Sequence, residues 1–162
     1  MTMAGRSVIL TLGGLFLLAG VSAPQARQAR DPRPIEEAVL TANAEMERAA
    51  AAVDADRLFT FMLDTDKGSV IQNGVLLATR EEALQRVKAN LRGISKIEYR
   101  WKRRLVTVLS ADVALLTADG ESIATTTEGQ VVTTPFAQTV VFVMREGHWK
   151  ALHAHQSTPQ VR

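Results

Sequence analysis

The fold is decided by the stretch VFVMREGHWKALHAHQS, which spans residues 141–157. It consists of an apolar run rich in valine, a charged turn at Glu146-Gly147, and a second run that begins at Trp149. Valine and aromatic residues favour strands, and a turn containing glycine between two such runs predicts an antiparallel hairpin. We therefore expect the C-terminal part of the chain to be β-sheet.

The same pattern extends upstream as far as Gly93. The segments between the turns are rich in Val, Ile, Thr and aromatic residues, and turn signals separate them at residues 110–112 and 128–129. Pro135 cannot donate a hydrogen bond to a neighbouring strand, so we expect a bulge or a sheet edge there. The predicted strands cover residues 94–109, 113–127, 131–145 and 149–157.

Helices are predicted before these strands. Asp31-Pro32 suits a helix start, because proline fits the first turn. Apolar residues then recur at steps of three and four, which predicts one buried stripe on a long helix. A short second helix follows the break at residues 54–56. The stripe of the first helix is Ile35, Val39, Ala42, Met46, Ala49 and Val53, and that of the second is Leu58, Phe61 and Met62.

A small hairpin and a third helix complete the pattern. Asn73-Gly74 is a strong turn signal between two short apolar runs, residues 69–71 and 75–77. Thr79 and Glu82 form a capping box at a helix start, and Gly93 supplies a left-handed end. Helices that precede a run of antiparallel strands indicate the α+β class, with the helices packed on one face of a strongly curved sheet.

Composition narrows the protein class. The chain has 162 residues, a formal net charge of +2 and a hydrophobic content of 46%, which suits one globular domain. Its charges are mixed along the chain, so a nucleic-acid-binding face is not expected. Cysteine is absent, which excludes disulfides, a thiol nucleophile and cysteine metal ligands.

The N-terminus predicts export. Residues 7–20 are almost wholly apolar and uncharged, follow a short leader with one arginine, and precede Val21-Ser22-Ala23. This length suits a signal-peptide core and falls short of the roughly 20 residues of a membrane span. We expect a cleaved signal peptide over residues 1–23, a lead-in over 24–33 and a secreted or periplasmic product that meets the membrane only during export. An uncleaved anchor is the alternative.

The chain resembles the SnoaL-like domains of the nuclear transport factor 2-like superfamily, which includes ketosteroid isomerase. The resemblance rests on the closing segment 141–157, on Asp64-Thr65-Asp66 before a short strand, and on Asn73-Gly74 leading to the capping box at Thr79. It covers about residues 35–158, which places the domain at 34–158 and a tail at 159–162. It implies a cone in which a curved antiparallel sheet of four long strands plus a short hairpin wraps around three N-terminal helices. It also implies an apolar pocket at one end and a homodimer through the sheet face.

The resemblance does not extend to ketosteroid isomerase chemistry. The family's tyrosine on the first helix corresponds to about Arg48, and its aspartate on the first short strand to Gln72 or Asn73. An amide is not a base near pH 7, and arginine has no phenol to donate a proton. Isomerase, cyclase or hydrolase activity would need other residues.

His153 and His155 are the candidate catalytic residues. Residues two apart share a face of a strand, so we expect Trp149, Ala151 and both histidines to point into the pocket. Imidazole titrates near neutral pH and could relay a proton. The alternative is one histidine bonded to a helix carboxylate and the other exposed. A metal site would need a third ligand, for which the candidates are Asp64, Asp66 and Glu98. We expect neither a metal nor a cofactor.

Five residues are candidate ligand contacts. Tyr99 and Trp101 share a predicted strand face with Arg103, which could meet an anionic group. The alternative is that the aromatics pack in the core and Arg103 lies at a rim or is turned out by a bulge. The full set is Tyr99, Trp101, Arg103, Phe61 and Trp149.

Two functions fit these features. The first is an exported domain that binds a small, largely apolar molecule in the cone, with proton transfer or hydrolysis assisted by His155. The second is a non-catalytic dimeric interaction module. An exposed apolar sheet patch with a filled cone would favour the second.

Overall fold

Helix α1 (Arg33–Ala51) forms the centre of the domain in a computed structural model that describes residues 31–159. The predicted signal peptide, the lead-in up to residue 30 and the last three residues of the tail lie outside this range. No helix of the described part is long and apolar enough to cross a membrane. Val39 and Ala49, from the predicted stripe, are fully buried, which confirms the helix and the face it turns to the core. Its N-cap is Pro32 and not Asp31.

The helix ends in a left-handed residue that is not glycine. Val53 has a φ of 60°. Its amide donates a hydrogen bond to the Ala50 carbonyl oxygen, and the Asp54 amide donates one to the Ala49 carbonyl oxygen. This is a Schellman-type end, in which glycine is usual because it has no Cβ to clash. Helix α2 (Ala55–Phe59) follows at once, and Asp54 caps it by accepting a 2.9 Å hydrogen bond from the Arg57 amide.

The hairpin and third helix are confirmed. Strands β1 (Val70–Gln72) and β2 (Val75–Leu77) flank Asn73 and Gly74, whose φ values of 49° and 83° are those of a type I′ turn. Helix α3 (Arg80–Asn90) begins with the predicted capping box, in which both the Thr79 and the Glu82 side chains bond to backbone amides.

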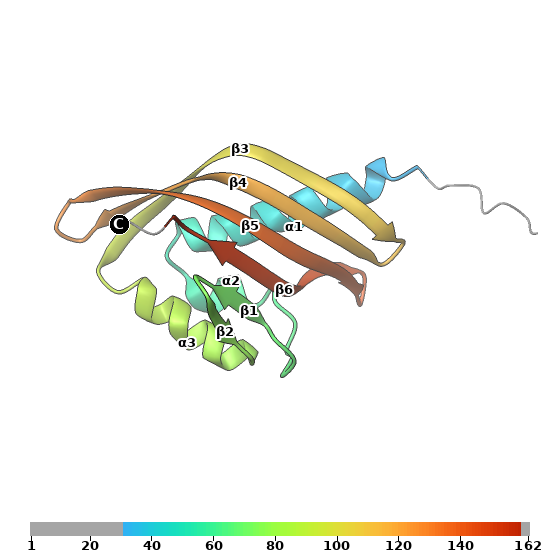
Figure 1. Ribbon diagram of the computed structural model, residues 1–162, viewed down its shortest axis with the longest axis horizontal. Helices are drawn as coiled ribbons and strands as arrows, with labels where there is room; N and C mark the ends of the chain where they lie inside the picture. The colour runs from blue at the N-terminus through green and yellow to red at the C-terminus, as the bar shows by residue number, and fades with distance from the viewer. Residues whose placement is uncertain (1–30, 160–162) are drawn as a thin grey trace, which may run out of the picture. The chain divides into compact units, whose positions relative to one another are not determined.

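Four long strands form the rest of the sheet (Figure 1). They are joined by short turns into an antiparallel meander, as predicted, and the strand order is β2-β1-β6-β5-β4-β3. Pro135 pairs with Glu121 on one side, and β6 reaches only to Ala137 on the other, so the predicted edge is confirmed. The strands are β3 (Ile94–Ser110), β4 (Val113–Thr126), β5 (Val131–Arg145) and β6 (His148–Ser157).

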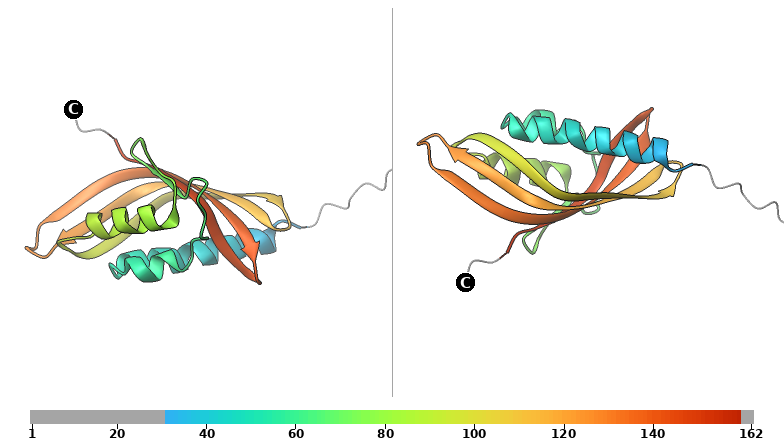
Figure 2. Two further views of the ribbon diagram at one scale, coloured as in Figure 1. Left: turned by 90° about the horizontal axis from the view of Figure 1, so that it is seen from below. Right: turned by 90° about the horizontal axis from the view of Figure 1, so that it is seen from above.

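One pairing was not predicted. The short strand β1 lies parallel to β6, with Ile71 opposite His155, and this contact attaches the hairpin to the edge of the meander. Helices α1 and α3 lie on the concave side of the sheet, and the other side, here called the outer face, carries no helix of the described residues (Figure 2). The core between α1 and the concave side includes Val39, Phe59, Leu116 and Phe142.

Candidate functional site

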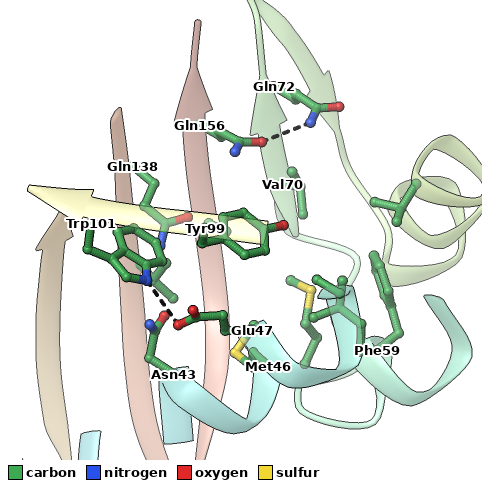
Figure 3. Close-up of a pocket in the computed structure, with 16 residues that line it drawn as sticks. Asn43, Met46, Glu47, Phe59, Val70, Gln72, Tyr99, Trp101, Gln138 and Gln156 are labelled. Carbon is green, nitrogen blue, oxygen red and sulfur yellow. Dashed lines mark hydrogen bonds between the residues drawn. The ribbon is translucent and has the colours of Figure 1, made fainter. Parts of the chain in front are cut away.

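A cavity of about 160 Å³ lies between α1 and the concave side of the sheet (Figure 3). Its wall is mainly apolar and draws on all three helices and on the sheet. Such a hollow, mostly apolar with a few polar groups, is the usual form of a small-molecule site. Its apolar lining includes Met46, Leu58, Phe59, Met62, Val70 and Val140.

Two aromatic side chains from β3 form one wall. The rings of Tyr99 and Trp101 are stacked, with centroids 5.8 Å apart and planes inclined by 13°. Phe136 on β5 meets both rings edge-on, at 5.9 Å and 5.3 Å. Both Tyr99 and Trp101 line the cavity. Burial, aided by the charge of Glu47, raises the pKa of Tyr99 to about 12, so its phenol remains a neutral hydrogen-bond donor well into the alkaline range.

Among the described residues that line this cavity, Glu47 is the one with a carboxylate. Its Oε2 accepts a 2.9 Å hydrogen bond from the Trp101 indole nitrogen and lies 3.8 Å from Nη1 of Arg104. The Arg104 guanidinium in turn sits 5.6 Å from the centre of the Trp101 ring. The carboxylate is thus held in place by a neutral donor and a cation, and an ionised carboxylate retains further lone pairs that can accept hydrogen bonds.

Asn43 lies one helical turn before Glu47 on the same cavity wall. Asn43 is only 4% exposed, and its side-chain nitrogen Nδ2 has no hydrogen-bond partner within residues 31–159. Buried amide groups are nearly always paired, because an unpaired one forfeits its hydrogen bonds to water. Asn43 therefore stands out as a polar group whose partner the described chain does not supply.

A row of glutamines crosses the sheet above these groups. Gln138, Gln156 and Gln72 are aligned on β5, β6 and β1, and all three line the cavity. Asn90 donates to Gln72 over 3.1 Å, and Gln72 donates to Gln156 over 3.0 Å. This chain of amides fixes the orientation of Gln156 and places a polar rim opposite Asn43 and Glu47.

His153 and His155 do not line this cavity, and the expectation that they share a face with Trp149 and Ala151 is wrong. Strand β6 contains a bulge at Leu152, because Val141 pairs with His153 whereas the next residue, Phe142, pairs with Ala151. The extra residue inverts the alternation beyond it. Ala154 and Gln156 therefore line the cavity.

The two histidines lie on the outer face. His155 is exposed, and Nδ1 of half-buried His153 lies 2.8 Å from the carbonyl oxygen of Gly68. Within residues 31–159 neither histidine bonds to a helix carboxylate, so that part of the alternative is wrong, whereas its exposed histidine is found at His155.

A second bulge accounts for Arg103. Trp101 pairs with Gly120, but Arg103 pairs with Asp119, so Lys102 is the extra residue of β3. Arg103 is turned out to the surface, where it forms a two-pronged ion pair with Asp119 at 2.9 and 3.0 Å. This is the outcome that the alternative reading of the sequence allowed. A side chain at Gly120 would place its Cβ 2.4 Å from the Arg100 carbonyl oxygen, so the bulge requires glycine opposite it.

Phe61 and Trp149 also lie away from the cavity. Trp149 is a core residue with 8% exposure, and Phe61 lies under the ammonium group of Lys150, 5.8 Å from it. The two line a separate depression beside the turn at Gly147. Of the five predicted ligand contacts, the structure thus brings Tyr99 and Trp101 to the cavity and places Arg103, Phe61 and Trp149 elsewhere.

The candidate metal ligands and the positions of the isomerase residues do not form a site in the described part of the chain. Among residues 31–159, no group of three His, Asp or Glu side chains comes together as a metal site. Glu98 pairs with Lys96, and Asp64 and Asp66 are exposed. Arg48, at the position of the isomerase tyrosine, is exposed and pairs with Glu45, whereas Gln72 does line the cavity.

Sequence reasoning missed Asn43, Glu47, Gln138 and Gln156, and it named Gln72 only as a position that matches the isomerase aspartate. Asn43 and Glu47 were signalled by their spacing of four, which places both on one side of a helix, directly after the stripe residues Ala42 and Met46. Gln138 and Gln156 carried no such signal, since each is one polar residue in a strand.

Comparison with known proteins agrees with the fold. A model of the SnoaL-like domain family matches residues 39–160. No curated protein matches by sequence.

Many solved structures share the fold, among them three described here. A candidate dehydratase of the nuclear transport factor 2-like family from Streptomyces avermitilis is 22% identical, with a TM-score of 0.70 over 81% of this chain and 100% of that one. A candidate scytalone dehydratase from Novosphingobium aromaticivorans is 12% identical, with a TM-score of 0.70 over 82% and 93%. A nuclear transport factor 2-like superfamily protein from Salmonella enterica is 13% identical, with a TM-score of 0.70 over 81% and 95%. At these identities the likeness to nuclear transport factor 2-like proteins concerns the fold. The sequence match over three quarters of the chain supplies the family: this protein belongs to the SnoaL-like domain family.

Proposed function

We propose that the domain binds a small, neutral and largely apolar molecule in the cavity between α1 and the sheet. The observation that carries this proposal is the cavity of about 160 Å³, walled by the stacked rings of Tyr99 and Trp101. An engineered apolar cavity of about 150 Å³ in another protein holds benzene. The size therefore suits a molecule built around one six-membered ring.

The proposal assigns the binding to groups inside the cavity and gives no part to His153 or His155. Both histidines lie on the outer face, beyond the bulge at Leu152. Inside, the polar groups are a neutral phenol, one carboxylate and several amides. These groups are suited to orient a bound molecule by hydrogen bonds.

Titration with cyclohexanone, followed by the indole ¹H–¹⁵N signals, tests the proposal. The chain has two tryptophans, so Trp101 reports on the cavity and buried Trp149 serves as an internal reference. We expect the Trp101 signal to move and saturate while that of Trp149 stays in place. Ala154→Leu, which fills the cavity from β6, should abolish the shift.

Two variants control for this result. Ala137→Leu makes the same change at an exposed position of β5, and His155→Ala removes the outer-face imidazole. Both should bind cyclohexanone as the natural chain does. Saturable binding that survives Ala154→Leu, or a Trp101 signal that never moves with any ring-sized probe, would contradict the proposal.

We further propose that the outer face forms a homodimer. One row of residues crosses all six strands there and combines apolar side chains, threonines and His155 without a charged residue; it consists of Leu105, Thr117, Thr139, His155, Ile71 and Leu76. Leu105 and Leu76 are 60% and 61% exposed, and exposed apolar patches often mark interfaces.

Light scattering tests the dimer. Thr117→Arg places a charge in the row, between Leu105 and Thr139, whereas Thr127→Arg makes the same change in the exposed turn before β5. We expect the dimer mass for the natural chain and Thr127→Arg, and the monomer mass for Thr117→Arg. A monomeric natural chain would refute this part.

Export is the third part of the proposal. Residues 1–23 are proposed to act as a cleaved signal peptide, on the basis of the apolar core at 7–20 and the small residues at 21–23. Expression of the full chain in a bacterial host should yield a product that begins at Pro24, as read by intact mass. Leu15→Arg, which interrupts the apolar core, should retain the precursor inside the cell.

A further inference from the structure

We propose that the cavity selects neutral ring compounds that carry a hydrogen-bond acceptor next to a donor, and that Asn43 and Glu47 recognise this pair. This inference rests on the proposed function, because it names the class of molecule that the same cavity takes.

Asn43 supplies the donor. It lines the cavity, it is 4% exposed, and its Nδ2 has no partner within the described residues. An apolar residue at this position of the helix would avoid the cost of burying an unpaired amide. An oxygen of a bound molecule would complete the hydrogen bond that the chain leaves open.

Glu47 supplies the acceptor and sets the charge preference. Its carboxylate is already paired with the Trp101 indole and the nearby Arg104 guanidinium. A cationic molecule would compete with Arg104 for a charge that is largely balanced, and an anionic one would meet carboxylate oxygens. A neutral O–H or N–H group can use the remaining lone pairs without either cost.

The spacing of the two residues sets the geometry of the bound group. Residues four apart on a helix lie side by side, with Cβ atoms roughly 5–6 Å apart. Figure 3 shows the Asn43 and Glu47 side chains next to each other below the aromatic wall. The acceptor and donor of the bound molecule must therefore sit on neighbouring atoms, as in a cyclic amide or an α-hydroxyketone. The rest of its ring would contact Met46 and the face of Tyr99.

Five six-membered ring compounds test the inference. δ-Valerolactam carries an acceptor next to a donor, cyclohexanone an acceptor alone, and cyclohexane neither, while cyclohexanecarboxylate and cyclohexylamine carry charges. Affinities come from the shift of the Trp101 indole signal. We expect the lactam to bind about tenfold more tightly than cyclohexanone, which corresponds to one further hydrogen bond, and both charged compounds to bind more weakly than the lactam.

Two cavity variants separate the roles. Asn43→Ala should weaken the lactam and cyclohexanone by about tenfold and leave cyclohexane unchanged, because only the first two have the oxygen that the amide meets. Glu47→Gln should improve the binding of cyclohexanecarboxylate relative to the lactam, because it removes the like charge. Gln85→Leu, at an exposed site on α3, controls for general effects of polar-to-apolar change.

The outcomes distinguish this inference from the proposed function. Equal affinities for the lactam, cyclohexanone and cyclohexane, or equal losses for all three in Asn43→Ala, would overturn the selectivity and leave a purely apolar pocket. Failure of every ring compound to bind would overturn the proposed function itself. Thermal unfolding of Asn43→Ala verifies that this variant is folded. If it is not folded, two other variants replace it: Asn43→Ser, which keeps a hydrogen-bond donor, and Asn43→Val, which does not. The inference then requires Asn43→Ser to bind the lactam more tightly than Asn43→Val.

Discussion

The indole N–H of Trp101 on β3 donates a 2.9 Å hydrogen bond to Oε2 of Glu47 on α1. The two residues are far apart in the sequence, and their bond joins the helix to the edge strand of the sheet beside the cavity. The Glu47 side chain is 26% exposed there, so water supplies only part of its solvation. The hydrogen bond consequently contributes both to the stability of the helix–sheet contact and to the orientation of the carboxylate.

Trp101→Phe tests the contribution of this bond. Phenylalanine retains an aromatic ring against Tyr99 and removes the N–H, which leaves the carboxylate without its neutral donor. We expect the free energy of unfolding in urea to fall by about 1–2 kcal/mol. If the double variant Trp101→Phe/Glu47→Gln loses as much as the sum of the two single changes, the residues are not coupled and the bond is not a stabilising one.

Tyr99 is expected to titrate with a pKa of about 12 instead of the ordinary value of 10.0. It is the single tyrosine of the chain, so the phenolate absorbance near 295 nm reports on it alone. Burial is the main cause and the Glu47 charge the lesser one. Glu47→Gln should therefore lower the pKa of Tyr99, but not to the ordinary value.

The same shift predicts how stability depends on pH at the alkaline end. Above pH 10 the unfolded chain ionises its tyrosine while the folded chain keeps the phenol protonated, so the unfolded state is favoured progressively. The stability contributed by the neutral phenol is fully present below pH 10 and is lost as the pH rises to about 12. We expect this loss to be about 2–3 kcal/mol in natural protein and absent in Tyr99→Phe.

Gly120→Ala tests the bulge in β3 that turns Arg103 outward. The added Cβ would lie 2.4 Å from the Arg100 carbonyl oxygen, a backbone atom that cannot move without disturbing the strand. We expect a loss of about 2–3 kcal/mol in the free energy of unfolding. Gly129→Ala meets open space in a turn and strains only the backbone, at φ of 83°, so it should cost about 1 kcal/mol. The reverse order of the two losses would contradict the bulge as described.

Val53 offers a site where stability can be gained. Its φ of 60° is unfavourable for a β-branched residue, by about 1–2 kcal/mol. Val53→Gly and Val53→Ala both remove the isopropyl group, but only glycine relieves the backbone. We therefore expect Val53→Gly to be more stable than Val53→Ala by about 1 kcal/mol in thermal or urea unfolding, because relief of the strain exceeds the added flexibility of glycine in the unfolded chain. Equal stabilities would show that the left-handed conformation costs little here.

Much of the fold could be predicted because it depends on neighbouring residues. The stripe that begins at Ile35 specifies one face of a helix, although α1 ends at Ala51, before the last predicted stripe residue, Val53. The capping box at Thr79 marks a helix start, and Asn73-Gly74 specifies a tight turn. Each of these signals acts within a few residues and needs no distant partner. The family resemblance added the arrangement of these elements, which the family match over residues 39–160 supports.

The composition of the cavity could be predicted only in part, because it depends on which way each strand residue faces. Tyr99 and Trp101 precede the bulge at Lys102 and point inward as simple alternation requires, whereas Arg103 follows that bulge and points outward. His153 and His155 follow the bulge at Leu152 and are likewise displaced to the outer face, with Gln156 in the position that alternation assigned to His155.

The chain by itself therefore determined the elements, their order and the core face of α1, since these follow from local periodicity and turn chemistry. Only the tertiary structure decided the facing of residues beyond each bulge, the parallel attachment of β1 to β6, and the meeting of Trp101 with Glu47. These features depend on distant parts of the chain, because an extra residue in a strand is accommodated by the partner strand and by the curvature of the sheet. The sequence of the strand itself specifies neither of these.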